Sequence, residues 1–203
     1  MFHTAGVPPR DGGAGMYVGA DEIRRMERLY GTPAEERMSY EMPDGEWRIL
    51  RRSQVHGRAH DVTAFVIRDG MLAAIAKHPY PPGIYRAPSG GVLPGESMEE
   101  GIRREMLEET GLQVRLNRYV LRVHVDFSHR GEVEHWTTHV FTAEALPGEM
   151  GPLDLEEIRE ARWVPLEDFP GRIRQGLLAS GSTGLRYRAW LHDRVMAAIG
   201  EGG

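Results

Sequence analysis

The chain has 203 residues, of which 25 are basic and 30 acidic, so its formal net charge is −5, and 40% of its residues are hydrophobic. This charge argues against a stable nucleic-acid partner, because phosphate contacts need clustered lysine and arginine. The chain has no cysteine, which excludes disulfides, thiolate zinc sites and cysteine nucleophiles, and no run of eighteen apolar residues predicts a membrane helix.

The N-terminal part differs from the rest of the chain in composition. Residues 1–20 are rich in glycine and proline and lack periodicity, which predicts a tail. Asp21 is a candidate N-cap for a short helix that Gly31 would end. We expect residues 1–45 to form a tail and a short helix, a candidate dimerisation arm of a homodimer, and residues 46–203 to form one α/β domain. The N-terminus lacks the apolar run of a signal peptide, which favours a cytoplasmic protein.

Strand-like patterns begin at the predicted domain boundary. Residues 47–55 read as a first strand. "HDVTAFVIRDG" and "MLAAIAKH" follow, and the Asp69–Gly70 pair between them predicts a β-hairpin. Residues 79–91 contain too much proline and glycine for regular structure and are expected to form a loop.

A helix should follow this loop. Ser97 and Glu100 stand at capping-box spacing, so the helix is expected to start at Met98, and Gly111 is placed to end it in a left-handed conformation. The helix is followed by two β-rich segments, a short strand and a terminal helix, at residues 112–127, 134–146, 160–166 and 184–200. This order predicts an α/β fold in which a mixed sheet is sandwiched between helices.

The predicted helix carries an acidic face beside an apolar one. Three glutamates fall within about 100° of one another around the helix axis, and the neighbouring stripe is apolar, with Met98, Ile102 and Met106; the glutamates are Glu105, Glu108 and Glu109. Such a face is either solvated or binds a divalent metal. Residues around it favour the metal, because a glycine loop and Glu96 precede the helix and Arg104 adjoins the first glutamate.

The spacing of these residues resembles the Nudix box without a mismatch. The box covers residues 90–112 and is carried by Gly90, Glu96, Arg104, Glu105, Met106, Glu108, Glu109, Gly111 and Leu112. The resemblance implies that residues 46–203 are a Nudix hydrolase domain, an α/β/α sandwich with a loop-helix-loop catalytic motif. It implies metal-dependent hydrolysis of a diphosphate linkage in a nucleoside diphosphate derivative, such as a nucleotide sugar, an ADP-ribose-like compound or a nucleoside triphosphate.

The resemblance also implies roles for single residues. Gly90, Glu105, Glu108 and Glu109 match the family's metal ligands, and carboxylate oxygens suit Mg²⁺ or Mn²⁺. Arg104 matches an arginine that orients a catalytic glutamate, so the catalytic candidates on the helix are Arg104, Glu105 and Glu108. Glu96 matches the acid that supports this network.

The general base is left open by the resemblance. Some family members use a glutamate of the box and others an acid in a later loop. The later loop offers Asp154, Glu156, Glu157 and Glu160, and Glu157, six residues before Trp163, best resembles the loop acid. An acid-rich surface loop without a catalytic role is the alternative.

The substrate subfamily cannot be assigned from motifs. ADP-ribose hydrolases of this family usually carry a proline about fifteen or sixteen residues beyond the box. In this sequence Phe127 and Ser128 occupy those positions, so that mark is missing. Aromatic residues that could stack on a base and an arginine that could hold a phosphate are the substrate-binding candidates: Tyr85, Arg86, Phe127 and Trp136. Packing in the core is the alternative for each aromatic residue. Four histidines, at 124, 129, 135 and 139, are not expected to converge on a metal.

Two other functional classes share this fold. Isopentenyl diphosphate isomerases rely on a cysteine, which this chain lacks. Non-catalytic Nudix-like ligand sensors or interaction modules typically lose glutamates of the box, whereas all are present here. The non-catalytic module is the remaining alternative to a hydrolase.

Overall fold

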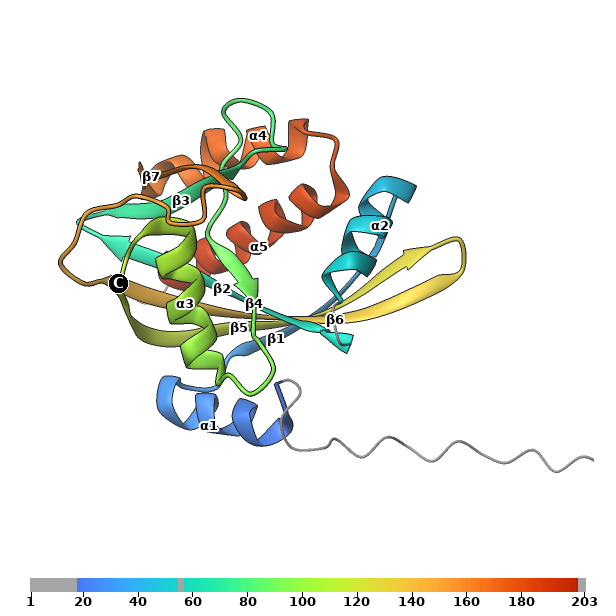
Figure 1. Ribbon diagram of the computed structural model, residues 1–203, viewed down its shortest axis with the longest axis horizontal. Coiled ribbons are helices and arrows are strands. Elements are labelled where there is room, and N and C mark those ends of the chain that lie inside the picture. The colour runs from blue at the N-terminus through green and yellow to red at the C-terminus, as the bar shows by residue number, and fades with distance from the viewer. Residues whose placement is uncertain (1–17, 55–56, 201–203) are drawn as a thin grey trace, which may run out of the picture.

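The computed structural model describes residues 18–54 and 57–200 (Figure 1). The predicted N-terminal tail lies outside these residues up to position 17. Seven strands form one mixed sheet: β1 (Ala34–Glu41), β2 (His60–Arg68), β3 (Met71–Lys77), β4 (Ser89–Gly91), β5 (Val114–His129), β6 (Glu132–Ala145) and β7 (Ile158–Pro165). The order is β1-β5-β6-β2-β3-β7, with β4 paired to β2. Strands β1/β5 and β2/β6 run parallel and the other pairs antiparallel.

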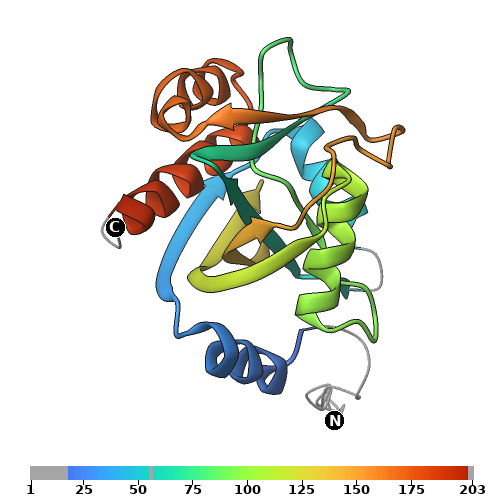
Figure 2. The ribbon, with the colours of Figure 1, turned by 90° about the vertical axis from the view of Figure 1, so that its left-hand side faces the viewer.

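Helices cover both faces of this sheet (Figure 2). One core contains Met26 of α1 (Ala20–Tyr30) and the apolar stripe of α3 (Met98–Thr110). The other core contains side chains of α2 (Asp44–Ser53), of the turns η2 (Leu166–Asp168) and η3 (Phe169–Ile173), and of α4 (Arg174–Ala179) and α5 (Thr183–Gly200). The predicted α/β/α sandwich with a mixed sheet is therefore confirmed.

The local signals around the central helix are also confirmed. Helix α3 starts at Met98 behind a complete capping box between Ser97 and Glu100, and Gly111 ends it at φ +74°. The hairpin turn between β2 and β3 has positive φ at Asp69 and Gly70, as a tight two-residue turn requires. In each case a short sequence motif fixes backbone hydrogen bonds within a few residues, so distant packing is not needed to form it.

Three N-terminal expectations were wrong or incomplete. The predicted strand at 47–55 is part of helix α2 as far as Ser53: Trp47 is buried while Ile49 is 68% exposed, which is the one-sided burial of a surface helix. Strand β1 was missed because "AEERMSYE" is rich in charge; it pairs with β5 at the edge of the sheet and is half exposed. Helix α1 starts at Ala20 behind Gly19, so Asp21 is not its N-cap.

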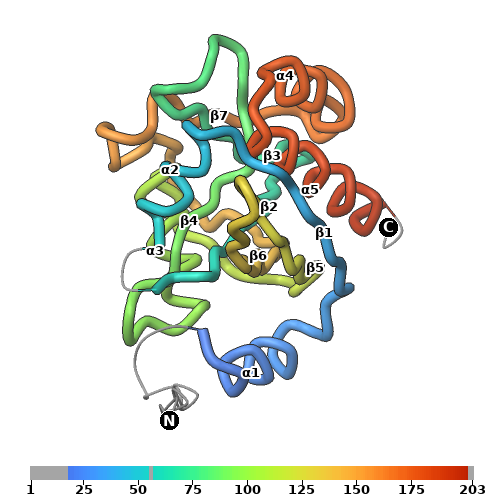
Figure 3. Tube along the Cα trace, turned by 90° about the vertical axis from the view of Figure 1, so that its right-hand side faces the viewer, coloured from blue at the N-terminus to red at the C-terminus, as the bar shows by residue number. Residues whose placement is uncertain are grey.

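The N-terminal segment is integrated with the rest of the fold. Strand β1 carries the chain from α1 on one side of the sheet to α2 on the other (Figure 3). The predicted boundary between residues 45 and 46 falls inside α2. The carboxylate of Glu22 on α1 accepts a hydrogen bond from the backbone N–H of Met98, the first residue of α3 (2.9 Å). A dimerisation role for residues 1–45 stays a prediction.

A second N-terminal glutamate caps the terminal helix. Glu46 on α2 accepts hydrogen bonds from Ser182 Oγ (3.1 Å), Thr183 N (3.0 Å) and Gly184 N (2.7 Å) at the start of α5. The first backbone N–H groups of a helix have no partner within the helix, and the helix dipole favours negative charge there. Glutamates of α1 and α2 thus accept hydrogen bonds from backbone N–H groups at the starts of α3 and α5.

Between residues 18 and 200, no described helix combines the length and the apolar character needed to cross a bilayer.

We expect Glu46→Ala to lower the free energy of unfolding by about 1–3 kcal/mol, because charge-assisted hydrogen bonds to the start of α5 are lost. Urea denaturation measures the change. Glu144→Ala is the matched control: its carboxylate pairs only at the surface with the exposed Arg115, and such pairs contribute about 0–1 kcal/mol. Equal effects of the two substitutions would contradict the capping role of Glu46.

Candidate functional site

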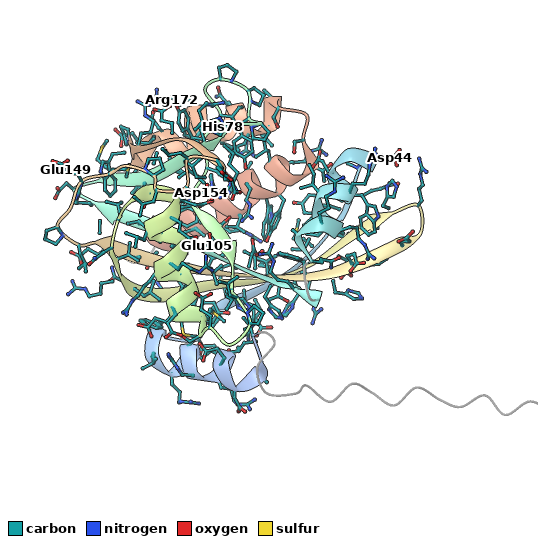
Figure 4. The ribbon with its side chains drawn as sticks, in the orientation of Figure 1. Asp44, His78, Glu105, Glu149, Asp154 and Arg172 are labelled. Carbon is teal, nitrogen blue, oxygen red and sulfur yellow. The ribbon has the colours of Figure 1, made fainter. Side chains whose placement is uncertain are left out.

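The carboxylates of α3 face the loop that leads into it. A Cβ atom at Gly90 would lie 1.8 Å from Cδ of Glu105, so the Glu105 carboxylate rests directly on the backbone of β4. A Cβ at Gly101 would meet Glu96 Oε2 at 3.1 Å and Val92 Cγ2 at 3.3 Å. These glycines allow α3 and the preceding loop to approach closely. Figure 4 shows Glu105 on α3, near a different loop, the one after β6 that carries Asp154.

Arg104 gathers three carboxylates around one guanidinium group. Its Nε and Nη2 donate to Glu96 (2.9 and 3.1 Å), and its Nη1 donates to Glu105 and Glu108 (2.9 Å each). Nη2 also donates to the carbonyl oxygen of Gly91 (2.7 Å). When all three carboxylates are ionised, they leave an excess of two negative charges around the guanidinium group. Burial raises the pKa of Glu105 to about 7, although the hydrogen bond from Arg104 lowers it.

A second charged group surrounds Glu109. This carboxylate is buried, accepts a hydrogen bond from Ser89 N (2.7 Å), and lies 3.5 Å from both Arg86 Nη2 and Lys77 Nζ. Burial raises the pKa of Glu109, while Arg86 and Lys77 oppose this shift. Lys77 also forms an ion pair with Glu157. Lys77 therefore joins the helix to the later loop.

Sequence reasoning missed Lys77. Its strand β3 changes register against β7 between Ala76 and Lys77, and such irregularities redirect side chains next to functional sites. The residue stands at the end of an apolar strand, "MLAAIAK". The sequence signal for Lys77 is a single charged residue at the end of an otherwise apolar strand.

The loop after β6 holds Glu157 in place. The backbone N–H groups of Leu153 and Asp154 donate to the Glu108 carbonyl oxygen at the end of α3 (2.8 and 3.0 Å). Asp154 Oδ1 accepts the N–H groups of Glu156 and Glu157 (3.1 and 3.0 Å). His78 N donates to the Glu157 carbonyl oxygen (3.2 Å). Of the loop acids, Glu157 is thus joined through Lys77 to Glu109, whereas Asp154 shapes the turn.

The substrate-binding candidates are dispersed. Arg86 is 3% exposed and donates to Tyr80 Oη, the Ala87 carbonyl oxygen and Ser89 Oγ, so it is oriented inward. Tyr85 Oη donates to Glu160 (2.7 Å). Among the described contacts, none joins Phe127 or Trp136 to the α3 carboxylates. Both are buried in the core beneath α5, where Phe127 packs on Tyr187 and Trp136 Nε1 donates to Asp61 (2.9 Å).

The four histidines have separate surroundings. His139 is buried and contacts His60 and Tyr119. His129 Nδ1 lies 2.8 Å from the Met42 carbonyl oxygen, and His135 lies against Asp126 (2.7 Å) at the surface. His124 lies 3.4 Å from Thr137 Oγ1. Each histidine has its own neighbours.

Within residues 18–54 and 57–200, no three His, Asp or Glu side chains are arranged as a metal cluster. Arg104 instead occupies the space between Glu105 and Glu108, and Glu109 faces β4. The donor chemistry nevertheless fits a hard divalent cation. Carboxylate oxygens are the ligands that Mg²⁺ and Mn²⁺ prefer, and one such ion would neutralise the two excess negative charges around Arg104.

His192 of α5 supports the loop that precedes Gly90. Its Nε2 accepts the backbone N–H of Ala87 (3.2 Å), and the ring packs against Phe65 and Phe169. Burial, with Arg188 and Arg86 nearby, lowers the pKa of His192 to about 3. The imidazole is therefore neutral in the folded protein, as its acceptor role requires.

The comparison with protein families gives one match: the NUDIX domain model matches residues 57–180, more than half of the chain. Residues 20–53, which include both capping glutamates, and α5 lie outside this match.

Two curated proteins illustrate the similarity. The chain is 35% identical over 107 residues to the NAD-capped RNA hydrolase NudC of Chromobacterium violaceum, covering 52% of this chain and 38% of that protein. It is 33% identical over 100 residues to the oxidized purine nucleoside triphosphate hydrolase of Mus musculus, covering 49% and 61%. The chain therefore spans between about two fifths and three fifths of the length of these relatives. A solved structure of a MutT NUDIX hydrolase from Burkholderia pseudomallei is 28% identical, with a TM-score of 0.44, and covers 62% of this chain and 98% of that one.

We expect acid to destabilise the protein in part through His192. The unfolded histidine binds a proton near pH 6.5, whereas the folded one resists protonation down to about pH 3, so stability present above pH 6.5 is lost as pH falls. One such group costs about 1.4 kcal/mol for each pH unit in this window. His192→Gln keeps an acceptor for Ala87 N–H and removes the titration. Urea denaturation between pH 7 and pH 4 should show a shallower loss for this variant, and parallel curves would contradict the prediction.

Proposed function

The chain belongs to the Nudix family, and from this membership together with the Arg104 carboxylate group we propose that it hydrolyses a diphosphate linkage in a nucleoside diphosphate derivative, using Mg²⁺ or Mn²⁺. The substrate is a small molecule such as a nucleotide sugar, an ADP-ribose-like compound or a nucleoside triphosphate. The two relatives support a nucleotide-containing substrate, since one is a hydrolase of NAD-capped RNA and the other a hydrolase of oxidized purine nucleoside triphosphates.

The observation that carries the proposal is the concentration of carboxylates at the start and along one face of α3. A diphosphate is anionic, so it cannot approach this face without a neutralising cation. Glu105, Glu108 and Glu109, with the backbone of Gly90, are the groups that would hold the cation. When bound, a divalent metal neutralises the diphosphate, polarises the phosphoryl group and lowers the pKa of water.

The side chains of Arg104 and Glu96 orient the carboxylates that would hold the cation. Arg104 fixes Glu105 and Glu108 by donating to both from one nitrogen. Glu96 holds the other edge of the guanidinium group, so the arginine cannot rotate without losing several charge-assisted hydrogen bonds. Such preorganisation places the carboxylates before substrate arrives, which avoids a reorganisation cost during the reaction.

We assign the general base to Glu157. Its carboxylate is half exposed and is held by Lys77 at the edge of the charged group, where a water molecule can reach it. In this role Glu157 accepts the proton of the attacking water, and Lys77 orients the carboxylate. Glu105 is the alternative base, because its carboxylate lies beside Glu108 on the guanidinium group of Arg104.

We expect release of phosphate or of a nucleoside monophosphate from a panel of these compounds, with Mg²⁺ or Mn²⁺ and not in excess EDTA. Glu157→Gln should lower kcat by about 100-fold or more, the usual contribution of a general base, with a small change in KM. Glu156→Gln, on the same loop, is the control. Unchanged turnover in Glu157→Gln would contradict its role as the base, and no cleavage of any compound would favour a non-catalytic ligand-sensing module.

The proposal extends to the setting of the enzyme. We propose that the protein is cytoplasmic, which the lack of cysteine supports. We also propose that it is a homodimer, which the position of β1 at the edge of the sheet supports. Leu29, on the helix that leads into β1, is 58% exposed and is a candidate for this contact. Size-exclusion chromatography with light scattering should give twice the chain mass of 22.8 kDa, and a monomer would contradict the dimer.

A further inference from the structure

A second arginine is buried beside the candidate metal ligands. Arg86 is 3% exposed, and its guanidinium group donates to several protein acceptors. Its Nε donates to Tyr80 Oη (2.9 Å), and its Nη1 donates to the Ala87 carbonyl oxygen (2.7 Å) and to Ser89 Oγ (2.9 Å). Its Nη2 faces Oε1 of Glu109 at 3.5 Å. Arg86 therefore contacts both a candidate metal ligand and the segment of chain that leads into β4.

The backbone of this segment is hydrogen-bonded at every polar group from the N–H of Arg86 to the N–H of Ser89. The partners come from β2, β3, α3, α5 and the Arg86 side chain: Ile75 for the N–H and C=O of Arg86, His192 for the N–H of Ala87, Arg86 Nη1 for the C=O of Ala87, Ala64 for the C=O of Pro88, and Glu109 for the N–H of Ser89. An unpaired buried backbone group costs free energy, so another path for this segment is unfavourable. The segment therefore holds Gly90, the next residue, in place.

Glu109 is held through one of its two carboxylate oxygens. Oε2 accepts the backbone N–H of Ser89 at 2.7 Å, whereas Oε1 lies 3.5 Å from both Arg86 Nη2 and Lys77 Nζ. Charge-assisted hydrogen bonds measure about 2.7–2.9 Å, so neither cation is bonded closely to Oε1. A positive charge nearby still favours the ionised form of a carboxylate. Arg86 therefore stabilises the negative charge of Glu109 and leaves Oε1 able to accept a ligand.

The contacts of Arg86 require an arginine. A guanidinium group carries donors on three nitrogens that are fixed in one plane, whereas lysine presents its donors from a single nitrogen. Only the guanidinium group can reach Tyr80, Ser89 and Glu109 together. A diphosphate bound to Arg86 would have to draw it away from Ser89 and the Ala87 carbonyl oxygen, which belong to buried residues, and a buried acceptor without a partner costs free energy. These contacts favour a structural task for Arg86 over the phosphate contact predicted from the sequence.

We infer that Arg86 is a positioning residue of the candidate metal site, which fixes Glu109 and the backbone that leads into β4, and that it does not bind the substrate. This inference rests on the proposed function, because Glu109 is one of the groups proposed to hold the cation. Arg104 orients the other two glutamates of the site. Each carboxylate proposed to bind the metal is thus held in place by an arginine.

Arg86→Lys tests this role, because it keeps a positive charge beside Glu109 and removes the planar guanidinium group. Electron paramagnetic resonance of free Mn²⁺, in a titration of the full chain, measures metal affinity without substrate. We expect Arg86→Lys to weaken Mn²⁺ binding by about 10-fold or more, as is usual when a residue that orients a metal ligand is replaced. Tyr80→Phe removes only the acceptor of Arg86 Nε and should weaken Mn²⁺ binding by about 2- to 10-fold, the effect of one hydrogen bond.

Val125→Ala is the control for a general loss of stability, because Val125 is a core side chain of β5 that is 1% exposed and lies outside the candidate site. Urea denaturation should show a lower free energy of unfolding for Val125→Ala and for Arg86→Lys, with Mn²⁺ affinity lowered only in Arg86→Lys. Unchanged Mn²⁺ affinity in Arg86→Lys, or an equal loss in Val125→Ala, would overturn the inference. If Arg86→Lys does not fold, Tyr80→Phe decides, and unchanged Mn²⁺ affinity in that variant would overturn the inference.

Steady-state kinetics separates this role from substrate binding. With Mn²⁺ at saturation, a positioning role leaves the KM of Arg86→Lys for the cleaved compound unchanged. A raised KM together with unchanged Mn²⁺ affinity would make Arg86 a substrate-binding residue and leave the proposed hydrolysis intact. Weakened Mn²⁺ binding in Arg86→Lys, without cleavage of any compound by the wild-type chain, would support the inference and remove the proposed function.

Discussion

The candidate site depends on one interaction: the guanidinium of Arg104 binds three carboxylates and the carbonyl oxygen of Gly91. Like charges this close repel one another, and burial adds a desolvation cost. Arg104 offsets part of both effects and also joins α3 to the strand before it. The contact is possible because Gly90 leaves space for the Glu105 carboxylate. The charge of Arg104, the absence of a side chain at Gly90 and the position of α3 therefore depend on one another.

The elements outside the matched domain support this arrangement from two sides. Glu22 binds the start of α3 and Glu46 binds the start of α5, and His192 on α5 binds the loop before Gly90. The N-terminal helices and the terminal helix thus hold the loop and the helix that form the site. Their contribution is positional, because each acts through backbone groups of another element.

Much of the fold could be predicted because its signals are local. The capping box at Ser97, the Asp69–Gly70 turn and the spacing of the box each involve residues close in sequence. The remaining features depend on distant partners: β1 is a strand because β5 pairs with it, and α2 is helical with Trp47 packed on His129. Lys77 was missed for the same reason, since its partners Glu109 and Glu157 are separated from it by 32 and 80 positions. The inward orientation of Arg86 also follows from tertiary contacts.

We propose that the carboxylates around Arg104 bind a divalent metal ion, and direct measurement of metal binding tests this without reference to any substrate. Electron paramagnetic resonance counts free Mn²⁺ in a titration of the full chain. We expect saturable Mn²⁺ binding that Glu108→Gln weakens by about 10-fold or more. Glu41→Gln, at the exposed end of β1, should leave the binding unchanged. Binding that is absent from the wild-type chain, or equal in all three proteins, would contradict it.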